Sequence, residues 1–173
     1  MKRKESNVSN NQPPLIYFDT NVYARPFDDQ NRLTIQAEAD AFLRLIEAVN
    51  SRQLRLLSSD ILLFEVHNIL NEDKRTKVLE YIKLCTQHIE SSDDVLSLGK
   101  QVQQQCSTCS RDALHIASAM LGNARYFLSC DTTVTKMKKT RCYRRLGKSF
   151  RQAYFSVMNP TRFVGRFEKG ELE

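Results

Sequence analysis

The stretch LIYFD, residues 15–19, decides the fold, because four apolar residues run directly into an aspartate. A short apolar run without polar alternation is typical of a strand buried on both faces of a parallel sheet. A second such run, FLSCD at residues 127–131, also ends in an aspartate. One aspartate at such a position is commonly a turn or cap residue. Ligands of open α/β sheets bind beyond the carboxyl ends of the strands, so we expect Asp19 and Asp131 to face one crevice.

Segments with helical periodicity separate these runs from further strands. Strands are predicted at 54–58, 125–130 and 154–158, and helices at 32–50, 61–70, 73–87, 94–105 and 111–121. Parallel neighbours need crossover connections of this length. The fold class is therefore α/β, with a mostly parallel central sheet and helices on both faces.

The length of 173 residues predicts one domain. The polar segment 1–14, closed by Pro13-Pro14, reads as a disordered leader. We expect the domain to span 15–167, with a basic insertion at 136–151 and a tail at 168–173. No apolar run approaches the roughly 20 residues of a membrane span or forms a signal peptide, so the sequence predicts a soluble, cytoplasmic protein without a membrane partner.

The five cysteines are odd in number and lie within or beside apolar segments, which favours a reducing compartment over a disulfide framework. Cys106 and Cys109 form a lone CxxC motif. A zinc site would need two further ligands at matching spacing, and the three histidines do not supply them. Packing thiols are the expectation.

Positive charge is concentrated near the carboxyl end. Ten of the 26 Lys and Arg lie between Thr132 and Phe167, where there is no Asp or Glu, and the rest of the chain carries more acids than bases. Such asymmetry indicates a polyanion partner, because neutralised phosphates release counterions, although a solvated basic loop gives the same pattern. The candidate RNA-binding residues are Lys136, Lys138, Lys139, Arg141, Arg144 and Arg145.

Glu65 lies at helical spacing from Ile61, Leu62 and Ile69, which places a carboxylate on an apolar face. A buried charge must be neutral, paired with a cation such as an arginine, or bound to a metal. Asp112 follows a predicted helix cap, Ser110, where an acidic side chain also favours the helix dipole.

These four acids, Asp19, Glu65, Asp112 and Asp131, form a candidate metal and catalytic site. Two carboxylates about 4 Å apart repel by roughly 4 kcal/mol at an effective dielectric of 20, so a cluster needs cations. No lysine or histidine lies at a matching place in these segments. Hard ions such as Mg²⁺ or Mn²⁺ prefer oxygen ligands and activate water for phosphodiester cleavage.

Four segments resemble motifs of the PIN-domain nucleases, in particular the small VapC-like toxins of prokaryotic toxin–antitoxin pairs. They are FDTNVY around Asp19, SSDILLFEV around Glu65, RDALHIASA around Asp112 and FLSCDTTV around Asp131. The resemblance runs from about Leu15 to Val164 and includes VMNPTRF near the end.

The resemblance implies a three-layer α/β/α fold and a Mg²⁺- or Mn²⁺-dependent endoribonuclease, with a homodimer and an inhibitory antitoxin as partners. It gives the four acids the metal-binding role, and Asn21 and Ser129 look like hydrogen-bonding residues behind them. His115 is expected to be packed or hydrogen-bonded, and Arg111 to contact phosphate or lie exposed beside the cap.

Two other readings stay open. A non-catalytic PIN-like module that binds RNA or protein would be expected to have lost some of the four acids, and all four are present. A Mg²⁺-dependent phosphohydrolase of another doubly wound family predicts a second aspartate near Asp19, whereas residue 21 is asparagine.

Overall fold

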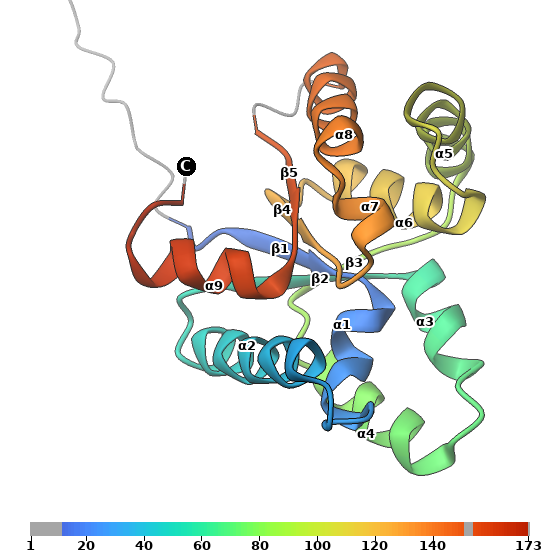
Figure 1. Ribbon diagram of the computed structural model, residues 1–173. Coiled ribbons are helices and arrows are strands. Elements are labelled where there is room, and N and C mark those ends of the chain that lie inside the picture. Colours follow the sequence, from blue (N-terminus) through green and yellow to red (C-terminus); the bar gives the residue numbers. More distant parts are fainter. Residues whose placement is uncertain (1–11, 151–153, 173) are drawn as a thin grey trace, which may run out of the picture.

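The computed structural model describes residues 12–150 and 154–172. Its centre is a five-stranded, all-parallel sheet in the order β3-β2-β1-β4-β5 (Figure 1). The strands are β1 (Leu15–Phe18), β2 (Arg55–Ser59), β3 (Gln87–Ile89), β4 (Tyr126–Leu128) and β5 (Ser156–Met158). The predicted α/β class and parallel sheet are confirmed.

Helices connect every pair of consecutive strands. They are α1 (Thr20–Ala24), a 3-10 turn η1 (Arg25–Phe27), α2 (Leu33–Asn50), α3 (Asp60–His67), α4 (Glu72–Ile82), α5 (Asp93–Cys106), α6 (Ser110–Leu121), α7 (Thr132–Thr135), α8 (Met137–Ser149) and α9 (Pro160–Glu168).

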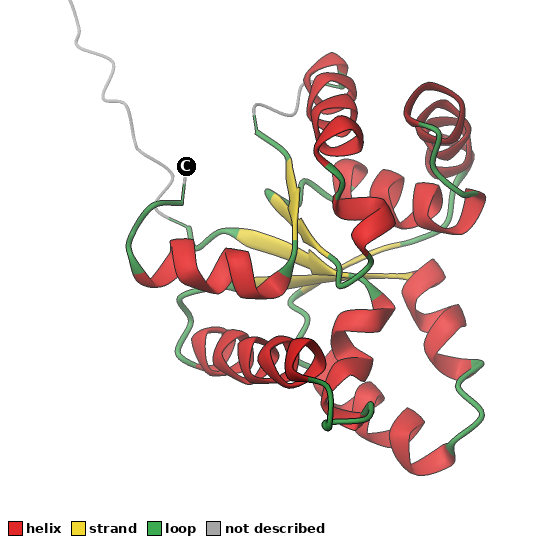
Figure 2. Cartoon of the chain, in the orientation of Figure 1, coloured by secondary structure: helices red, strands yellow, loops and turns green. Residues whose placement is uncertain are grey.

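The helices lie in two layers around the sheet (Figures 1 and 2). Helices α1, α2 and α9 pack together on one face, and α5, α6 and α8 pack together on the other. The apolar run of β1 is buried along its whole length because both layers cover it. This is the three-layer α/β/α arrangement.

The order of the strands creates a switch point beside β1. The chain proceeds outward from β1 to β2 and β3, and then places β4 on the other side of β1. Ligand sites of open parallel sheets form where the strand order reverses in this way. In the pairing of β1 with β4, Phe18 lies opposite Leu128, so the next residues, Asp19 and Ser129, are neighbours at this switch point.

The predicted helix over 73–87 is wrong in its last five residues. Helix α4 ends at Ile82, and Gln87–Ile89 forms the edge strand β3, which pairs with β2 from Leu57 to Ser59. This strand is short, mostly exposed and polar in sequence, so it lacks the apolar run by which the other strands are found. Backbone pairing with β2 determines it.

Helix α6 also begins one residue earlier than expected. Cys109 holds the N-cap position, and Ser110, the predicted cap, is the first helical residue. Ser59 caps α3, because its Oγ accepts a hydrogen bond from the Leu62 N–H at the start of that helix. Asp112 remains in the first turn of its helix.

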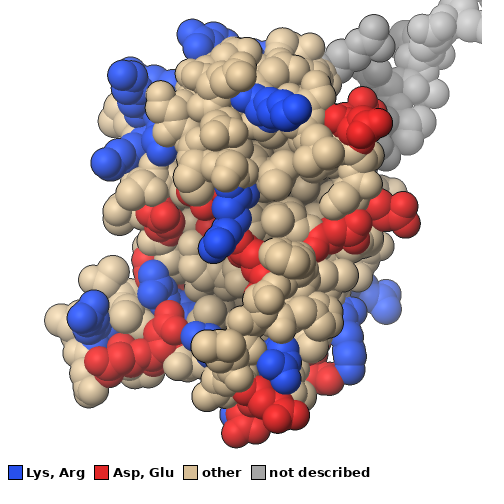
Figure 3. Space-filling model, turned by 90° about the vertical axis from the view of Figure 1, so that its right-hand side faces the viewer, with Lys and Arg blue, Asp and Glu red and all other residues tan. Residues whose placement is uncertain are grey.

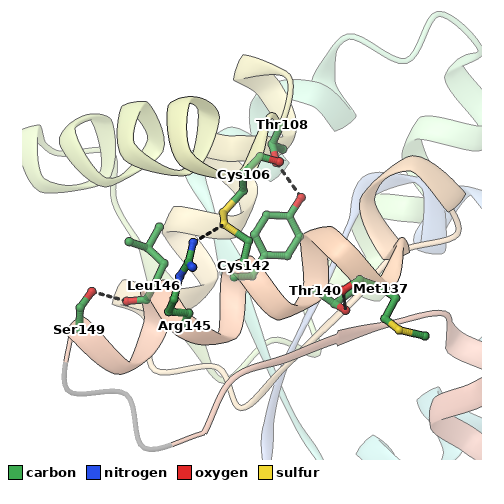
Figure 4. The surroundings of a disulfide bond; sticks show 9 residues. Cys106, Thr108, Met137, Thr140, Cys142, Arg145, Leu146 and Ser149 are labelled. Carbon is green, nitrogen blue, oxygen red and sulfur yellow. Dashed lines mark hydrogen bonds between the residues drawn. A yellow bond between two sulfur atoms is a disulfide. The ribbon is translucent and has the colours of Figure 1, made fainter.

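The expectation that the cysteines are packing thiols is wrong for two of them. Cys106 at the end of α5 and Cys142 on α8 form a disulfide, with Cα atoms 5.6 Å apart (Figure 4). Cys85, Cys109 and Cys130 are free thiols. The sequence signal failed because the partner of Cys106 is 36 residues away and not the adjacent CxxC cysteine.

The predicted leader, 1–14, lies outside the described residues except for its last three positions, and it stays a prediction. The segment predicted as a basic insertion forms α8 over most of its length, and its last position, 151, lies outside the described residues. Among the helices of the described ranges, none is long and apolar enough to cross a membrane.

Candidate metal centre

Asp19 lies at the carboxyl end of β1 and is only 6% exposed. Its Oδ2 accepts hydrogen bonds from Asn21 Nδ2 and from Ser129 Oγ, each at 2.7 Å. Burial raises the pKa of the Asp19 carboxyl, and the nearby Asp112 and Glu65 carboxylates raise it further, against His115 and Ser129, which lower it. The raised pKa shows that this site disfavours an uncompensated negative charge.

Asn21 and Ser129 both contact Asp19 and fix the loop after β4. The Asn21 Oδ1 accepts from the Cys130 N–H at 2.9 Å, and the Ser129 Oγ accepts from the Asp131 N–H at 3.0 Å. The two side chains therefore orient the Asp19 carboxylate, which is the arrangement expected of hydrogen bonds behind a metal ligand.

Glu65 reaches the same place from α3. Its side chain is 14% exposed, accepts a short hydrogen bond from the Thr20 hydroxyl, and lies 3.2 Å from Arg111 Nε and 3.0 Å from His115 Nε2. Burial alone raises the pKa of the Glu65 carboxyl, but these three neighbours outweigh it and lower the pKa. The expectation that no histidine accompanies the acids is wrong, because α6 brings His115 against Glu65.

His115 completes a compact group of three potential ligands. Single ligand atoms of Asp19, Glu65 and His115 all lie within 4.8 Å of one another. The ring is 1% exposed, in keeping with the expected packed histidine, and its Nδ1 lies 2.7 Å from the Tyr17 hydroxyl. Its spacing of three positions from Asp112 on one helix was the signal available in the sequence.

Asp112 shares a pocket with this group without joining it closely. The pocket has a volume of about 340 Å³ and is lined by Asp19, Thr20, Asn21, Ala24, Glu65, Ile69, Lys74, Arg111 and Asp112. Three of the four predicted acids thus line one pocket. We call it the acidic pocket.

Asp131 does not line the acidic pocket. Its Oδ1 accepts a 2.6 Å hydrogen bond from the Thr133 N–H and caps α7. The register explains this position, because Ser129, and not Asp131, follows the residue opposite Phe18. Asp131 instead lies with Asp112, Arg111 and Lys139 around an adjacent pocket of about 600 Å³.

A third pocket, the basic groove, has a volume of about 830 Å³ and lies beside the disulfide (Figure 4). Its charged lining residues are Lys136, Lys138, Lys139, Arg141 and Arg145. Lys139 lines both this groove and the pocket of Asp131. In Figure 3 basic side chains gather in the upper left part of the face, and acidic side chains cross its middle.

Arg144, the sixth predicted RNA-binding residue, does not line the groove. Its guanidinium lies over the Tyr154 ring, 5.8 Å from the ring centroid. Helix α8 therefore has one basic face on the groove and another basic residue beside the segment leading to β5.

Comparison with known proteins finds no matching family model and no matching curated protein. Among solved structures, the chain is similar to VapBC2 from Rickettsia felis bound to a DNA fragment from their promoter. The likeness has 12% sequence identity and a TM-score of 0.49, and it covers 83% of this chain and 98% of that chain.

Proposed function

We propose that this chain is a divalent-metal-dependent endoribonuclease of the PIN type that hydrolyses RNA phosphodiester bonds. The observation that carries the proposal is the group of Asp19, Glu65 and His115, of which Asp19 and Glu65 line a pocket together with Asp112. Carboxylates gathered at the switch point of a parallel sheet suit Mg²⁺ or Mn²⁺.

The donor atoms present fit such an ion. Glu65 Oε1 and His115 Nε2 are buried and make no hydrogen bond with the described residues. The raised pKa of Asp19 indicates a carboxylate whose charge lacks full compensation. Asp19, Glu65 and Asp112 would hold the ion, with Asp131 next to Asp112. A bound ion would supply a water nucleophile at neutral pH and stabilise charge on the leaving oxygen.

The protein's own residues orient the site and its substrate. Asn21 and Ser129 hold the Asp19 carboxylate in place. Arg111, whose side chain is 73% exposed, lines the acidic pocket and can contact a phosphate that enters it. The acidic pocket shares Arg111 and Asp112 with the pocket of Asp131, and that pocket shares Lys139 with the basic groove. The basic groove would hold the flanking RNA backbone.

One observation favours the alternative of a non-catalytic RNA- or protein-binding module. Glu65 has two nitrogen neighbours in the protein itself, Arg111 Nε at 3.2 Å and His115 Nε2 at 3.0 Å, and the Arg111 cation can satisfy its charge without a metal. The two functions differ in their need for ions. RNA binding by a module would be independent of Mg²⁺ and Mn²⁺, and no cleavage would follow.

The resemblance extends the proposal to the toxin of a toxin–antitoxin pair, acting as a homodimer. A toxin of this kind would arrest the growth of a bacterial host on expression, and Asp19→Asn would relieve the arrest. Growth arrest of equal strength by the Asp19→Asn protein would remove the toxin part of the proposal.

Cleavage of a labelled RNA by the purified protein tests the main proposal. We expect cleavage with Mg²⁺ or Mn²⁺, none with chelator, and a loss of at least about 100-fold in rate for Asp19→Asn and Asp112→Asn, because an ion could no longer be held correctly. Asp40→Asn changes an exposed acid of α2 outside the acidic pocket and serves as the matched control. Undiminished cleavage by the Asp19 and Asp112 variants would refute the site.

A further inference from the structure

His115 has one ring nitrogen that the protein leaves without a hydrogen bond. The ring is 1% exposed, and Nε2 is among the few buried side-chain polar atoms of the described residues that lack a hydrogen-bond partner. Burial without a partner is costly for a polar atom. Nε2 lies beside Asp19 and Glu65, 3.0 Å from Glu65 Oε2, so these two carboxylates determine what this atom can bind.

The spacing of the donor atoms matches ligands of one ion. His115 Nε2 lies 3.0 Å from Glu65 Oε2, but the two atoms do not have hydrogen-bond geometry. Two ligands at right angles, each about 2.1 Å from a metal, are separated by roughly 3.0 Å. The carboxylate of Asp19 completes the group within 4.8 Å.

The other ring nitrogen is held as it is in metal-binding histidines. His115 Nδ1 lies 2.7 Å from the Tyr17 hydroxyl, which lies 2.5 Å from Ser59 Oγ. Ser59 accepts a further hydrogen bond from the Leu62 N–H at 3.2 Å. If Nδ1–H donates to Tyr17 and Tyr17 donates to Ser59, Nε2 carries the free lone pair. An outer hydrogen bond of this kind fixes the tautomer and orientation of a metal-binding imidazole.

We infer that His115 Nε2 is a ligand of the metal centre, together with Asp19 and Glu65. The centre is then a mixed carboxylate and imidazole site that selects Mn²⁺ over Mg²⁺. Imidazole suits transition metals, and Mg²⁺ takes oxygen ligands almost exclusively. This inference rests on the metal-dependent function proposed above and changes the all-carboxylate site that the four acids predict.

Electron spin echo measurements on the full chain with bound Mn²⁺ test the inference directly. We expect modulation from a directly coordinated nitrogen in the wild type and its loss in His115→Gln. An Mn²⁺ signal without nitrogen coupling, or no Mn²⁺ binding by the wild type, would overturn the assignment.

Calorimetric titration with Mn²⁺ and with Mg²⁺ gives a second readout. His115→Gln removes the nitrogen ligand and leaves both carboxylates in place. The ratio of the affinity for Mn²⁺ to the affinity for Mg²⁺ should therefore fall by about tenfold or more. Tyr17→Phe keeps the imidazole and removes its outer hydrogen bond, so Mn²⁺ affinity should fall by about tenfold with the nitrogen coupling retained. An unchanged ratio in His115→Gln would exclude a ligand role.

These binding results are separable from nuclease activity. Nitrogen-coupled Mn²⁺ in a protein that cleaves no RNA would leave the His115 assignment standing and remove the nuclease. RNA cleavage with no nitrogen coupling would keep the nuclease and refute the role of His115.

Discussion

The buried carboxylate of Asp19 has a raised pKa, so its ionisation lowers the free energy of unfolding at neutral pH. In the folded chain its oxygen is held by Asn21 and Ser129, while burial and the neighbouring acids oppose its charge. A raised folded-state pKa means that the folded state binds this proton more tightly than the unfolded state does. The associated stability is present at low pH and is lost as the pH rises through the folded pKa.

We therefore predict that Asp19→Asn loses activity without losing stability. In chelator at pH 7, its free energy of unfolding in urea should lie within about 1 kcal/mol of the wild type or above it, because asparagine has no charge to bury. As the pH falls toward the raised pKa of Asp19, the free energy of unfolding of the wild type should increase relative to that of the variant.

Asp131→Asn is a useful comparison at the same scale. Its carboxylate caps α7 through the Thr133 N–H, and the capping oxygen remains in asparagine, so stability should change little. A loss of 2 kcal/mol or more in Asp19→Asn alone, on the order of a broken buried hydrogen bond, would contradict the expectation for Asp19.

At the scale of elements, α8 presents its cations in two directions. Lys139 and Arg145 line the basic groove, whereas Arg144 lies over the Tyr154 ring and Lys148 is exposed without lining the groove. Two double variants can therefore remove the same charge from the same helix. Only one of them changes the groove.

We predict that Lys139→Ala with Arg145→Ala weakens RNA binding, because these residues face the path that leads to the acidic pocket. Each lost phosphate contact should lower the slope of log affinity against log salt by about 0.7 for a single strand. Arg144→Ala with Lys148→Ala should leave the slope nearly unchanged. Fluorescence anisotropy over a salt series measures the slopes. Equal changes for both double variants would show that α8 acts through its total charge and not through the basic groove.

The disulfide links α8 to α5 and so supports the wall of the groove (Figure 4). Closing a loop between residues 36 positions apart should stabilise the fold by about 3 to 4 kcal/mol through the entropy of the unfolded chain. We predict that Cys142→Ser lowers the free energy of unfolding by about this amount. The wild type in reductant should have the same free energy of unfolding as Cys142→Ser.

Cys109→Ser provides the control for this prediction, since Cys109 is an exposed free thiol. Its stability should be no lower than that of the wild type, because serine is a favoured residue at this N-cap position, and it should remain sensitive to reductant. A wild type that is unaffected by reductant would show that the disulfide does not contribute to stability.

At the scale of the whole molecule, the buried Glu38 carboxylate joins two segments that lie 121 positions apart in the sequence. Glu38 on α2 is 3% exposed, lies 2.6 Å from Arg25 Nε and accepts a hydrogen bond from Asn159 Nδ2 at 2.7 Å. These residues come from the turn after α1, from α2 and from the start of α9. The pair therefore depends on three segments that meet only in the folded chain.

We predict that Glu38→Ala destabilises the protein by about 3 kcal/mol, because it removes the buried carboxylate beside Arg25 Nε and the acceptor of the Asn159 amide, while Asp28 still pairs with Arg25 Nη1. Glu168→Ala, which removes the exposed pair with Arg44, should cost no more than about 1 kcal/mol. Urea unfolding of the two variants measures the contrast. Similar losses in both would show that burial of the Glu38 pair does not matter.

The sequence by itself determined the strands with apolar runs and the helices with a continuous apolar face. A strand buried on both faces leaves an unbroken apolar run, and a helix buried on one face leaves apolar residues at helical spacing. It also placed Asp19 at a strand end, where the structure has it. The side chain of Glu65, predicted on an apolar face, is 14% exposed but contacts Thr20, Arg111 and His115. The edge strand β3 has neither an apolar run nor an apolar face, so its pairing could not be predicted.

Only the tertiary structure decided which chemical groups meet. The register of β1 against β4 placed Ser129 beside Asp19 and moved Asp131 to the next pocket. The packing of α6 beside α3 brought His115 against Glu65, and that of α8 on α5 brought Cys142 to Cys106. LIYFD fixes where one carboxylate lies along the chain, but distances between residues far apart in sequence arise from the packing of the layers, and no local pattern encodes them.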